Sequence, residues 1–382
     1  MVRNHYAVTD PTATTPATTP TASSADDPHR IGLLVGDGIG HEIVPATRRV
    51  VDAAVAAAGG PAVEWVPLPL GADAIATHGT PIPHSTLDAL ADLDAWILGP
   101  HDNASYPEPF RSELTPGGRI RKQFDLYANI RPAKVLPGIR AVVPDMDLLI
   151  VRENTEGLYA DRNMTLGTGE FMPTPDVALA VGVVTRAACE RIAHSACRLA
   201  ARRRRRVTIV HKANVLSMTT GLFRDVCREV AGRYPGLTVD DEHVDAMAAH
   251  LVRHGGDYDV VVTENMFGDI LSDLAGELAG SLGTAGSINA SADKAMAQAA
   301  HGAAPDIAGR NRANPTALFL SAAMLLDHLA TTGDRPWFSR AAHRIENAVE
   351  ATIASGVATA DLGGQASTAE FTEIVIARTR LR

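Results

Sequence analysis

Short apolar runs alternate along this chain with longer segments of helical periodicity. The short runs predict strands at Ile31–Val35, Val63–Val66, Ala95–Leu98, Tyr127–Ile130, Asp147–Val151, Val207–Val210, Leu237–Asp240 and Val260–Val262. Helical spacing predicts one helix after Gly40 as far as about Ala58, and others at Leu87–Leu93, Arg186–Arg203, Gly221–Arg233, Asp245–His254, Pro315–Leu329, Arg340–Ser355 and Thr368–Thr379. This alternation predicts α/β layers built on a largely parallel sheet.

The stretch from Val261 to Asp273 is predicted to be a buried strand that turns into a helix. Asn265 or Gly268 would end the strand, and helical spacing follows. Asp269 and Asp273 are four residues apart, so both carboxylates lie on one face of that helix. A hard divalent cation with oxygen ligands would relieve their repulsion. The alternative is two solvated acids near a helix N-terminus, where the macrodipole favours negative charge.

Two other strand ends carry residues that suit ligand chemistry. The turn Gly36–Gly40 has the spacing G-x-G-x-G, which differs from the dinucleotide fingerprint G-x-G-x-x-G, so a standard Rossmann unit is not expected. Its glycines suit either a backbone that approaches a phosphate or a tight turn. Lys212 follows the strand Val207–Val210, where a lysine of lowered pKa can serve as a base.

Three arginines lie at the ends of strand-like segments: Arg121, Arg131 and Arg152. Such side chains suit bidentate recognition of carboxylates, although for any one of them a surface ion pair is the stronger interpretation. Tyr159 follows Arg152 at short range, and its hydroxyl can act as an acid or simply pack half-buried. Asp245 opens a predicted helix and would add a third carboxylate.

Bulk composition excludes several classes of protein. The formal charge of -9 argues against nucleic-acid binding and against attachment to an anionic membrane. Cys189, Cys197 and Cys227 have no metal-binding spacing, which indicates reduced thiols and a cytoplasmic protein. No apolar run is long enough to cross a bilayer. Residues 1–30 are rich in Thr, Pro, Ala and Ser, and we expect a disordered tail.

Arg202–Arg206 is a run of five arginines at a predicted helix-to-strand junction. The run could bind an anionic partner. Cations at a helix C-terminus favour the macrodipole, and the chain as a whole is acidic, so a structural role is the stronger interpretation.

Taken together, these motifs resemble the β-decarboxylating dehydrogenases, the family of isocitrate, homoisocitrate, 3-isopropylmalate and tartrate/malate dehydrogenases. The resemblance extends from Ile31 to the C-terminus, and its segments occur in the family's order. They are Gly36–Glu42, Arg121–Pro132, Val151–Tyr159, His211–Leu216, Val244–Met247, Thr263–Asp273, His301–Pro315 and Asp361–Gly364.

The resemblance implies a role for each candidate residue. Asp269 and Asp273 would bind Mg²⁺ or Mn²⁺ together with Asp245 from a partner subunit. Arg121, Arg131 and Arg152 would hold the carboxylates of a malate. Tyr159 would be the acid, and Lys212, again from the partner subunit, would be the base. The resemblance therefore implies a homodimer with shared active sites, acting on a small molecule.

The cofactor implied is NAD. The segment His301–Gly309 resembles the family's adenosine loop, in which His301, Gly302, Ala304, Asp306 and Ile307 would contact the cofactor, with Asn314 at the adenine. The Asp306 carboxylate would accept hydrogen bonds from ribose hydroxyls and repel a 2′-phosphate. An N-cap of a helix that starts at Ile307 is the alternative role for Asp306.

The substrate's C3 arm would be read by the loop before Arg121. Isopropylmalate enzymes usually carry leucines there, whereas this chain has Gly117, Gly118 and Arg119. A basic side chain and open space favour a polar or charged arm, as in isocitrate or homoisocitrate, unless Arg119 is merely solvated. The alternatives are 3-isopropylmalate dehydrogenase, favoured by Val244–Met247, then tartrate or malate dehydrogenase, and last a non-catalytic regulatory subunit.

The fold implied has two α/β domains of the isocitrate/isopropylmalate dehydrogenase type, with parallel-rich sheets flanked by helices. Residues 31–126 and 280–382 would form the cofactor-binding domain. Residues 127–279 would form the substrate and dimerisation domain, with the active site in the cleft between the two.

Overall fold

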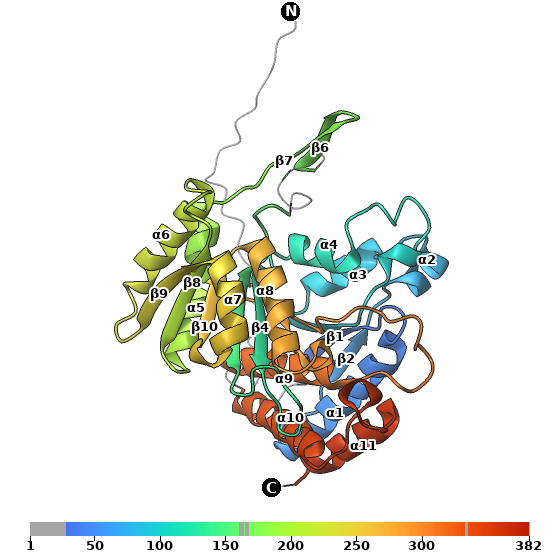
Figure 1. Ribbon diagram of the computed structural model, residues 1–382. Coiled ribbons are helices and arrows are strands. Elements are labelled where there is room, and N and C mark those ends of the chain that lie inside the picture. Colours follow the sequence, from blue (N-terminus) through green and yellow to red (C-terminus); the bar gives the residue numbers. More distant parts are fainter. Residues whose placement is uncertain (1–27, 160–163, 165–167, 333–334, 382) are drawn as a thin grey trace, which may run out of the picture.

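The computed structural model describes residues 28–159, 164, 168–332 and 335–381, and its centre is a sheet of ten strands (Figure 1). Neighbouring strands are parallel at both ends of the sheet, and the middle strands pair antiparallel. In spatial order the strands are β2 (Glu64–Pro67), β1 (Arg30–Leu34), β3 (Ala95–Leu98), β12 (Ala295–Gln298), β11 (Ile288–Ala290), β4 (Ala128–Lys134), β5 (Asp147–Glu153), β10 (Val260–Thr263), β8 (Arg206–His211) and β9 (Thr238–His243).

Helices cover both faces of the half of the sheet that contains β1 and β3. Alternate residues separate the two faces: Leu33 and Ile97 join one apolar core, and Leu34 and Trp96 join the other. The first core is closed by α1 (Gly40–Ala57), α9 (Thr316–Thr332), α10 (Pro336–Ala354) and α11 (Thr368–Thr379). The second is closed by α3 (His84–Ala91) and α4 (Pro116–Gln123), and α2 (Ala72–His78) precedes them in the chain.

The half of the sheet around β10 is sandwiched in the same way. Val260 and Val262 face a core shared with α5 (Arg186–Ala201) and α6 (Thr219–Ala231). Val261 faces a core shared with α7 (Val244–His254) and α8 (Asn265–Leu278). All four residues of β10 are buried, as its β-branched sequence predicted.

The α/β class and every predicted strand and helix are confirmed, with shifts at the ends of most elements. The helix after β10 begins at Asn265, so Gly268 lies inside α8 rather than before it. Elements that the sequence did not predict are α2, α4, β11, β12 and the hairpin of β6 (Glu170–Thr174) and β7 (Val177–Ala180). The division into two domains stays a prediction; one continuous sheet connects the two proposed parts through the pairing of β11 with β4.

The arginine run is mostly occupied by contacts within the chain. Arg203 bridges Asp147 and the buried Asp259, each at 2.8 Å. Arg206 pairs with Asp240 at 2.7 Å, and Arg204 donates to the carbonyl of Asp147. These contacts tie α5 to the ends of neighbouring strands and support the structural interpretation of the run. In the described part of the chain, no helix combines the length and apolar character that crossing a membrane requires.

Candidate active site

The turn from β10 into α8 places two acidic side chains beside the middle of the sheet. Glu264 caps the helix, because its side chain accepts a hydrogen bond from the backbone N–H of Phe267 at 3.2 Å. One turn later α8 passes directly over Arg152 of β5. A Cβ atom on Gly268 would lie 2.6 Å from the Arg152 side chain, so glycine permits this close approach. Asp269 then faces the Arg152 guanidinium.

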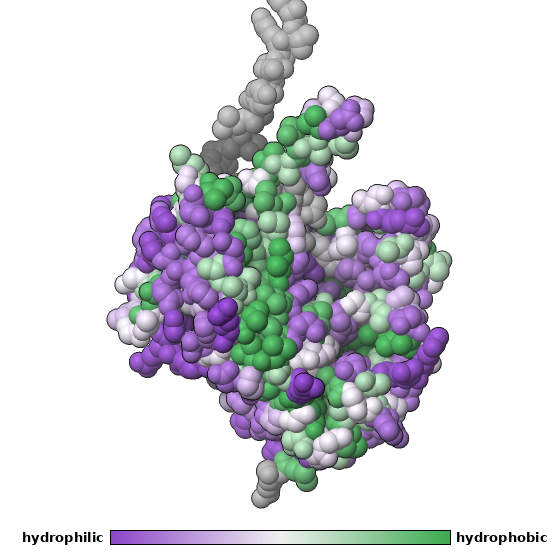
Figure 2. All heavy atoms as spheres, in the orientation of Figure 1, coloured by the Kyte–Doolittle hydropathy of each residue, from purple (hydrophilic) through white to green (hydrophobic). Residues whose placement is uncertain are grey.

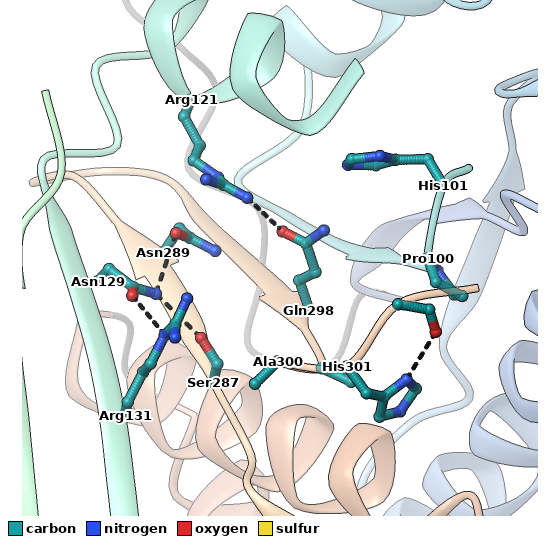
Figure 3. A pocket seen from close by; sticks show the side chains of 12 residues that line it. Pro100, His101, Arg121, Asn129, Arg131, Ser287, Asn289, Gln298, Ala300 and His301 are labelled. Atoms are coloured by element: carbon teal, nitrogen blue, oxygen red, sulfur yellow. Dashed lines mark hydrogen bonds between the residues drawn. The ribbon is translucent and has the colours of Figure 1, made fainter. Parts of the chain in front are cut away.

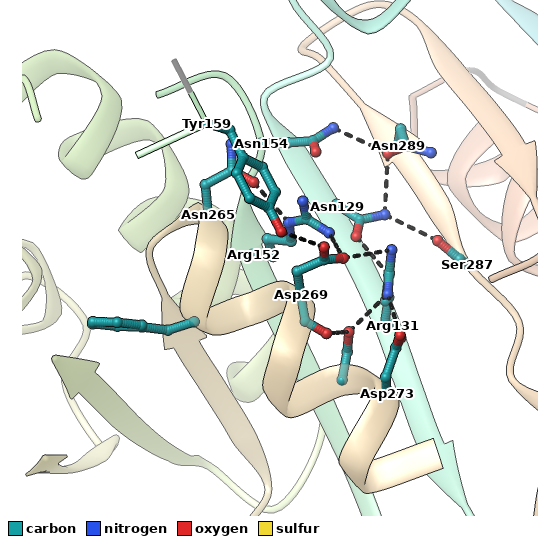
Figure 4. A network of polar contacts seen from close by, with 12 residues as sticks. Asn129, Arg131, Arg152, Asn154, Tyr159, Asn265, Asp269, Asp273, Ser287 and Asn289 are labelled. Atoms are coloured by element: carbon teal, nitrogen blue, oxygen red, sulfur yellow. Dashed lines mark hydrogen bonds and ion pairs between the residues drawn. The ribbon is translucent and has the colours of Figure 1, made fainter. Parts of the chain in front are cut away.

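Asp269 is surrounded by three groups that stabilise its negative charge (Figure 4). Arg152, which is 2% exposed, forms a short ion pair with Oδ1. The Tyr159 hydroxyl donates to Oδ2 at 2.5 Å, and Arg131 lies 3.4 Å from Oδ1. Burial raises the pKa of the Asp269 carboxyl, but Arg152, Tyr159 and Arg131 together hold it below its usual value.

Asp273 lies one turn further along α8 and shares Arg131 with Asp269. Arg131 donates to Asp273 at 2.9 Å and to the hydroxyl of Ser272 at 2.8 Å. The positive group between the two acids in this structure is therefore the Arg131 guanidinium. Burial raises the pKa of the Asp273 carboxyl, and the charge of Asp269 adds to this effect against Arg131. Asp273 is thus the less fully compensated acid.

A network of buried amides and hydroxyls supports these charges (Figure 4). Asn265 accepts from Arg152 at 2.9 Å, and Asn129 accepts from Arg131 at 2.8 Å. The Asn129 amide in turn donates to Ser287 at 2.9 Å and to Asn289 at 3.1 Å, which connects β4 to β11. Each arginine is fixed at its Nε while its terminal N–H groups face the acids.

Beside this network lies a cavity of about 200 Å³ with a polar lining (Figure 3). Arg121 reaches it from α4 and donates to Gln298 of β12 at 3.0 Å. The side chain of His101 extends toward Arg121, and its buried Nε2 has no hydrogen-bond partner in the described structure. Burial, and then the charge of Arg121, lower the pKa of His101 to about 4, so its ring is neutral at pH 7. Asn129, Arg131, Ser287, Asn289 and His301 also line this cavity.

Lys212 and Asp245 form a pair of their own at the ends of β8 and β9. The Lys212 ammonium donates to Asp245 at 2.5 Å, and Asp245 is 67% exposed. The hydrogen bond from Lys212 holds the pKa of the Asp245 carboxyl below its usual value. Within the described residues, no three His, Cys, Asp or Glu side chains are arranged to hold a metal ion. Asp245 therefore does not join Asp269 and Asp273 inside one chain.

A second cavity, of about 520 Å³, lies against the start of α1. The segment after β12 closes over the glycine turn there: the Ile39 N–H donates to the Ala303 carbonyl at 2.9 Å, and a Cβ on Gly38 would lie 2.1 Å from that carbonyl. The backbone approach is therefore the reason for glycine at this turn. Five of the six predicted cofactor residues line this cavity: His301, Gly302, Ala304, Ile307 and Asn314.

Comparison with known proteins identifies the family. Residues 30–375 match the model of the isocitrate/isopropylmalate dehydrogenase family. The chain is 43% identical over 352 residues to an isocitrate/homoisocitrate dehydrogenase of Thermus thermophilus, which covers 91% of this chain and 98% of that protein. The chain belongs to the isocitrate/isopropylmalate dehydrogenase family. It is also 40% identical over 343 residues to a 3-isopropylmalate dehydrogenase of Archaeoglobus fulgidus, covering 90% and 97% of the two chains.

The fold of this dehydrogenase matches solved members of the family. The crystal structure of isocitrate dehydrogenase from Methylococcus capsulatus superposes with a TM-score of 0.80 at 38% identity, over 92% of this chain and all of that one. The resemblance inferred from the motifs is therefore confirmed at the level of family and fold. The chain is a dehydrogenase, and its relatives differ in the arm of the malate named as their substrate.

Two of the predicted site residues of this dehydrogenase, Arg119 and Asp306, are not among the residues that line the two cavities, and their roles stay predictions. Arg119 is on α4, two residues before Arg121 and thus about 200° from it around the helix, so it is not among the residues that line the cavity. Asp306 is exposed and lies just outside the second cavity. No helix starts at Ile307, because the next helix begins at Thr316; the N-cap alternative for Asp306 is therefore wrong.

The polar residues that connect the predicted site residues were not predicted from the sequence. The asparagine network and Gln298 come from strands whose neighbours are set only by the tertiary fold. His101 follows the buried strand β3 after Gly99 and Pro100, a strand-end position that was the available signal. Arg312 and Asp361 line the second cavity, and Asp361 accepts from the Asn314 amide at 2.8 Å.

Proposed function

We propose that this dehydrogenase catalyses the NAD-dependent oxidative decarboxylation of a 3-substituted (2R)-malate with a polar or charged arm, such as isocitrate or homoisocitrate. The observation that supports this most is the chemistry of the cavity at Arg121. Two arginines, three amide side chains and two histidines line it, and its apolar lining consists of Pro100, Ala299 and Ala300. An isopropyl group would leave these polar groups without partners, whereas a carboxylate arm would engage them.

The malate part of the substrate would be held by Arg121, Arg131 and Arg152. Arg121 donates to the Gln298 amide at 3.0 Å and lines the cavity, where its planar guanidinium suits a carboxylate. Arg131 is 15% exposed and fixed through Asn129, which orients its terminal N–H groups without cancelling their charge. Such preorganisation lowers the entropic penalty of binding a dicarboxylate.

Asp269 and Asp273 would hold a Mg²⁺ or Mn²⁺ ion, with Asp245 of a second copy as the third acid. The donor set fits, because carboxylate oxygens are the ligands that these hard cations prefer. The incomplete compensation of Asp273 also fits, since a cation would relieve the repulsion that raises the pKa of that carboxyl. Arg131 would then be released from the acids toward the substrate carboxylate.

The residues divide the proton transfers between them. A bound cation would supply Lewis-acid chemistry at the 2-hydroxyl, and NAD would supply the hydride acceptor. Lys212 of the second copy, once it has lost its own proton, would take the hydroxyl proton at Nζ. The arginines hold the carboxylates while the C3 carboxylate leaves as CO₂. Tyr159 delivers a proton from its Oη to C3, and Asp269 orients that hydroxyl at 2.5 Å.

The cofactor is proposed to be NAD, bound in the second cavity. His301 and Gly302 line both cavities, so a dinucleotide lying in one reaches the substrate in the other. Asp306 is exposed and directly precedes Ile307, which lines the second cavity, and a carboxylate there would disfavour the 2′-phosphate of NADP. Arg312 lines the same cavity and would favour a phosphate, which makes the comparison of NAD with NADP an informative one.

A homodimer with shared sites is proposed because large apolar side chains are exposed close to Lys212, at Val215 and Met218, and on other elements. Figure 2 shows a hydrophobic strip over α8, where Ile270 is 58% exposed. The β6–β7 hairpin projects from the body, and its Phe171 and Met172 are 50% and 61% exposed. Exposed apolar side chains of this kind favour a partner surface. A cytoplasmic location is proposed as well, since all three cysteines are buried and unpaired.

The alternatives remain those of the family. A 3-isopropylmalate dehydrogenase is favoured by the Archaeoglobus fulgidus relative, and tartrate or malate dehydrogenase comes behind it. A regulatory subunit is disfavoured, because Tyr159, Asp269, Asp273 and the arginines form one charged network.

The test is initial rates of NADH formation with Mg²⁺ on isocitrate, homoisocitrate, 3-isopropylmalate, tartrate and malate, with NADP run in parallel. We expect the highest kcat/KM with NAD and a charged-arm substrate. Arg119→Met tests whether Arg119 binds the arm of the substrate or is merely solvated. A loss of about tenfold or more in kcat/KM for the charged-arm substrate, with kcat/KM for malate unchanged, would show that Arg119 binds the arm. A preference for 3-isopropylmalate would contradict the proposed substrate class.

A further inference from the structure

A buried histidine forms a hydrogen bond with the backbone of the turn that carries Lys212. His211 is the last residue of β8 and is 2% exposed. Its Nδ1 receives a hydrogen bond from the backbone N–H of Ala213 at 3.0 Å, so Nδ1 carries no proton. The ring hydrogen must therefore reside on Nε2, which donates to Asp241 at 2.7 Å. The geometry thus fixes a neutral imidazole in a single tautomer.

Asp241 is itself fixed from two sides. It lies on β9, whose residues pair in register with β8, and its other carboxylate oxygen forms a short ion pair with Arg228 of α6. Burial raises the pKa of the Asp241 carboxyl, but His211 and Arg228 hold it below its usual value. Burial, together with the nearby His243 and Arg224, lowers the pKa of His211 although Asp241 raises it. A carboxylate facing a neutral ring is the state that both partners favour.

The other contacts of the turn leave its outer side free. The Lys212 backbone N–H donates to Thr220 at 3.1 Å, and the Lys212 carbonyl accepts from Val215 and Leu216. Val215 and Met218 are 68% and 85% exposed. The turn is therefore anchored on its inner side, at His211 and Thr220. β9 continues into α7, which carries Asp245, the partner of the Lys212 ammonium.

We propose that His211 is a positioning residue: its Nδ1 fixes the turn that presents Lys212, and Asp241 locks the tautomer that this requires. The proposal rests on the proposed function, in which Lys212 is the base. His211 does not touch the substrate. It determines where the Lys212 ammonium stands relative to Asp245, so that both enter the site of a second copy in one geometry.

Two substitutions separate the two hydrogen bonds of the ring. His211→Asn places an oxygen near the position of Nδ1 and keeps the acceptor for Ala213. His211→Gln keeps a donor near the position of Nε2 for Asp241 and removes that acceptor. We expect His211→Gln to lower kcat on the order of 10²-fold, and His211→Asn to stay within about threefold of the wild type. The KM for NAD should be unchanged in both variants.

Lys212→Met is measured beside them, so that failure of the base assignment can be told apart. If Lys212→Met keeps the wild-type kcat, the proposed role of Lys212 is wrong and the role of His211 falls with it. If Lys212→Met is inactive while His211→Gln keeps its kcat, only the positioning role is overturned. Equal losses of kcat and thermal midpoint in both His211 variants would indicate packing and would also overturn it.

A measurement on the unaltered enzyme covers the case in which a variant does not fold. Nitrogen chemical shifts of ¹⁵N-histidine-labelled enzyme, assigned by comparison with His211→Asn, distinguish the two neutral tautomers. We expect the Nε2–H form of His211 at pH 7. A proton on Nδ1 would break the bond to Ala213 and contradict the proposal.

Discussion

Arg152 and Arg131 show how single residues determine the chemistry of the site. Both guanidinium groups are anchored at Nε by an asparagine, and both direct their remaining N–H groups at Asp269. Amide anchors orient an arginine without neutralising it. The positive charge therefore stays available to the acids of α8 and to a dicarboxylate substrate.

Tyr159→Phe tests the proposed acid. The phenolic oxygen bonds Asp269 at 2.5 Å, and the ring lies against Arg152, so phenylalanine removes the proton donor and keeps the packing. We expect kcat to fall by about 10²–10⁴-fold with little change in the KM for NAD. Tyr127→Phe is the matched control, because that ring contacts Arg191 and its hydroxyl lies outside the proposed chemistry. Wild-type turnover by Tyr159→Phe would exclude the assignment.

Among single residues, the charged members of the site could be predicted from the sequence, but the residues that they contact could not. Spacing alone put Asp269 and Asp273 on one helical face, and strand ends marked the arginines. The bonds from Asn129 to Ser287 and Asn289 cross about 160 residues of sequence, at separations of 158 and 160. Neutral amides have no charge pattern that would reveal such pairings. Arg119 was also marked by its charge, and because it is not among the residues that line the cavity its role stays a prediction.

The contact of α8 with β5 explains Gly268 at the scale of elements. A Cβ there would lie 2.6 Å from both Cβ and Cγ of Arg152, atoms too close to the backbone to move aside. We expect Gly268→Ala to destabilise the fold by about 1–3 kcal/mol, despite the better helix propensity of alanine. The measurement is the urea midpoint, together with the KM for the substrate, which should rise as Arg152 shifts.

Gly276→Ala on the same helix is the control for that substitution. Its Cβ would meet the flexible end of Leu282 at 3.3 Å, which can yield slightly. We expect a change within about 1 kcal/mol of the wild type. If both variants were equally stable, close packing on Arg152 would not be the reason for glycine at position 268.

Elements buried on both faces were the ones that the sequence predicted best. β3 and β10 consist of apolar residues that satisfy the pattern of a parallel strand without help from context. β11 and β12 contain alanine, asparagine and glutamine, so their strand state comes from pairing with β4 and β3 rather than from propensity. The β6–β7 hairpin is exposed on both faces and has no alternation of burial to detect. α4 begins with Pro116 and two glycines, which obscured a short helix.

For the whole molecule, the buried histidine His29 predicts a dependence of stability on pH. Burial, and then the charge of Arg335, lower the pKa of His29 to about 4. Histidine in the unfolded chain titrates near pH 6.5, so between pH 6.5 and 4 the unfolded chain binds more protons. The contribution of His29 to the free energy of unfolding is therefore fully present above pH 6.5 and falls as the pH drops through this range. The loss from this residue amounts to about 2 kcal/mol at pH 5.

His29→Asn isolates that contribution, because it keeps an acceptor for the Arg335 guanidinium and removes the titration. We expect the thermal midpoint of the variant to fall less than that of the wild type between pH 7 and pH 5. His343→Asn, at an exposed histidine, should leave the pH dependence as it is. If the thermal midpoint of His29→Asn falls between pH 7 and pH 5 as much as that of the wild type, His29 does not cause the pH dependence.

In the proposed homodimer each active site is built from two copies of the chain, and subunit complementation measures this sharing directly. Asp269→Asn and Lys212→Met should each be inactive as homodimers. In a hybrid dimer one site carries both substitutions and the other carries neither, because each site takes Asp269 from one copy and Lys212 from the other. After random exchange about half of the dimers are hybrids, and each hybrid has one intact site of two. A shared active site therefore predicts recovery of about a quarter of wild-type activity. If native mass spectrometry shows the hybrid and the mixture stays inactive, Asp269 and Lys212 do not combine across subunits, and the shared active site is contradicted.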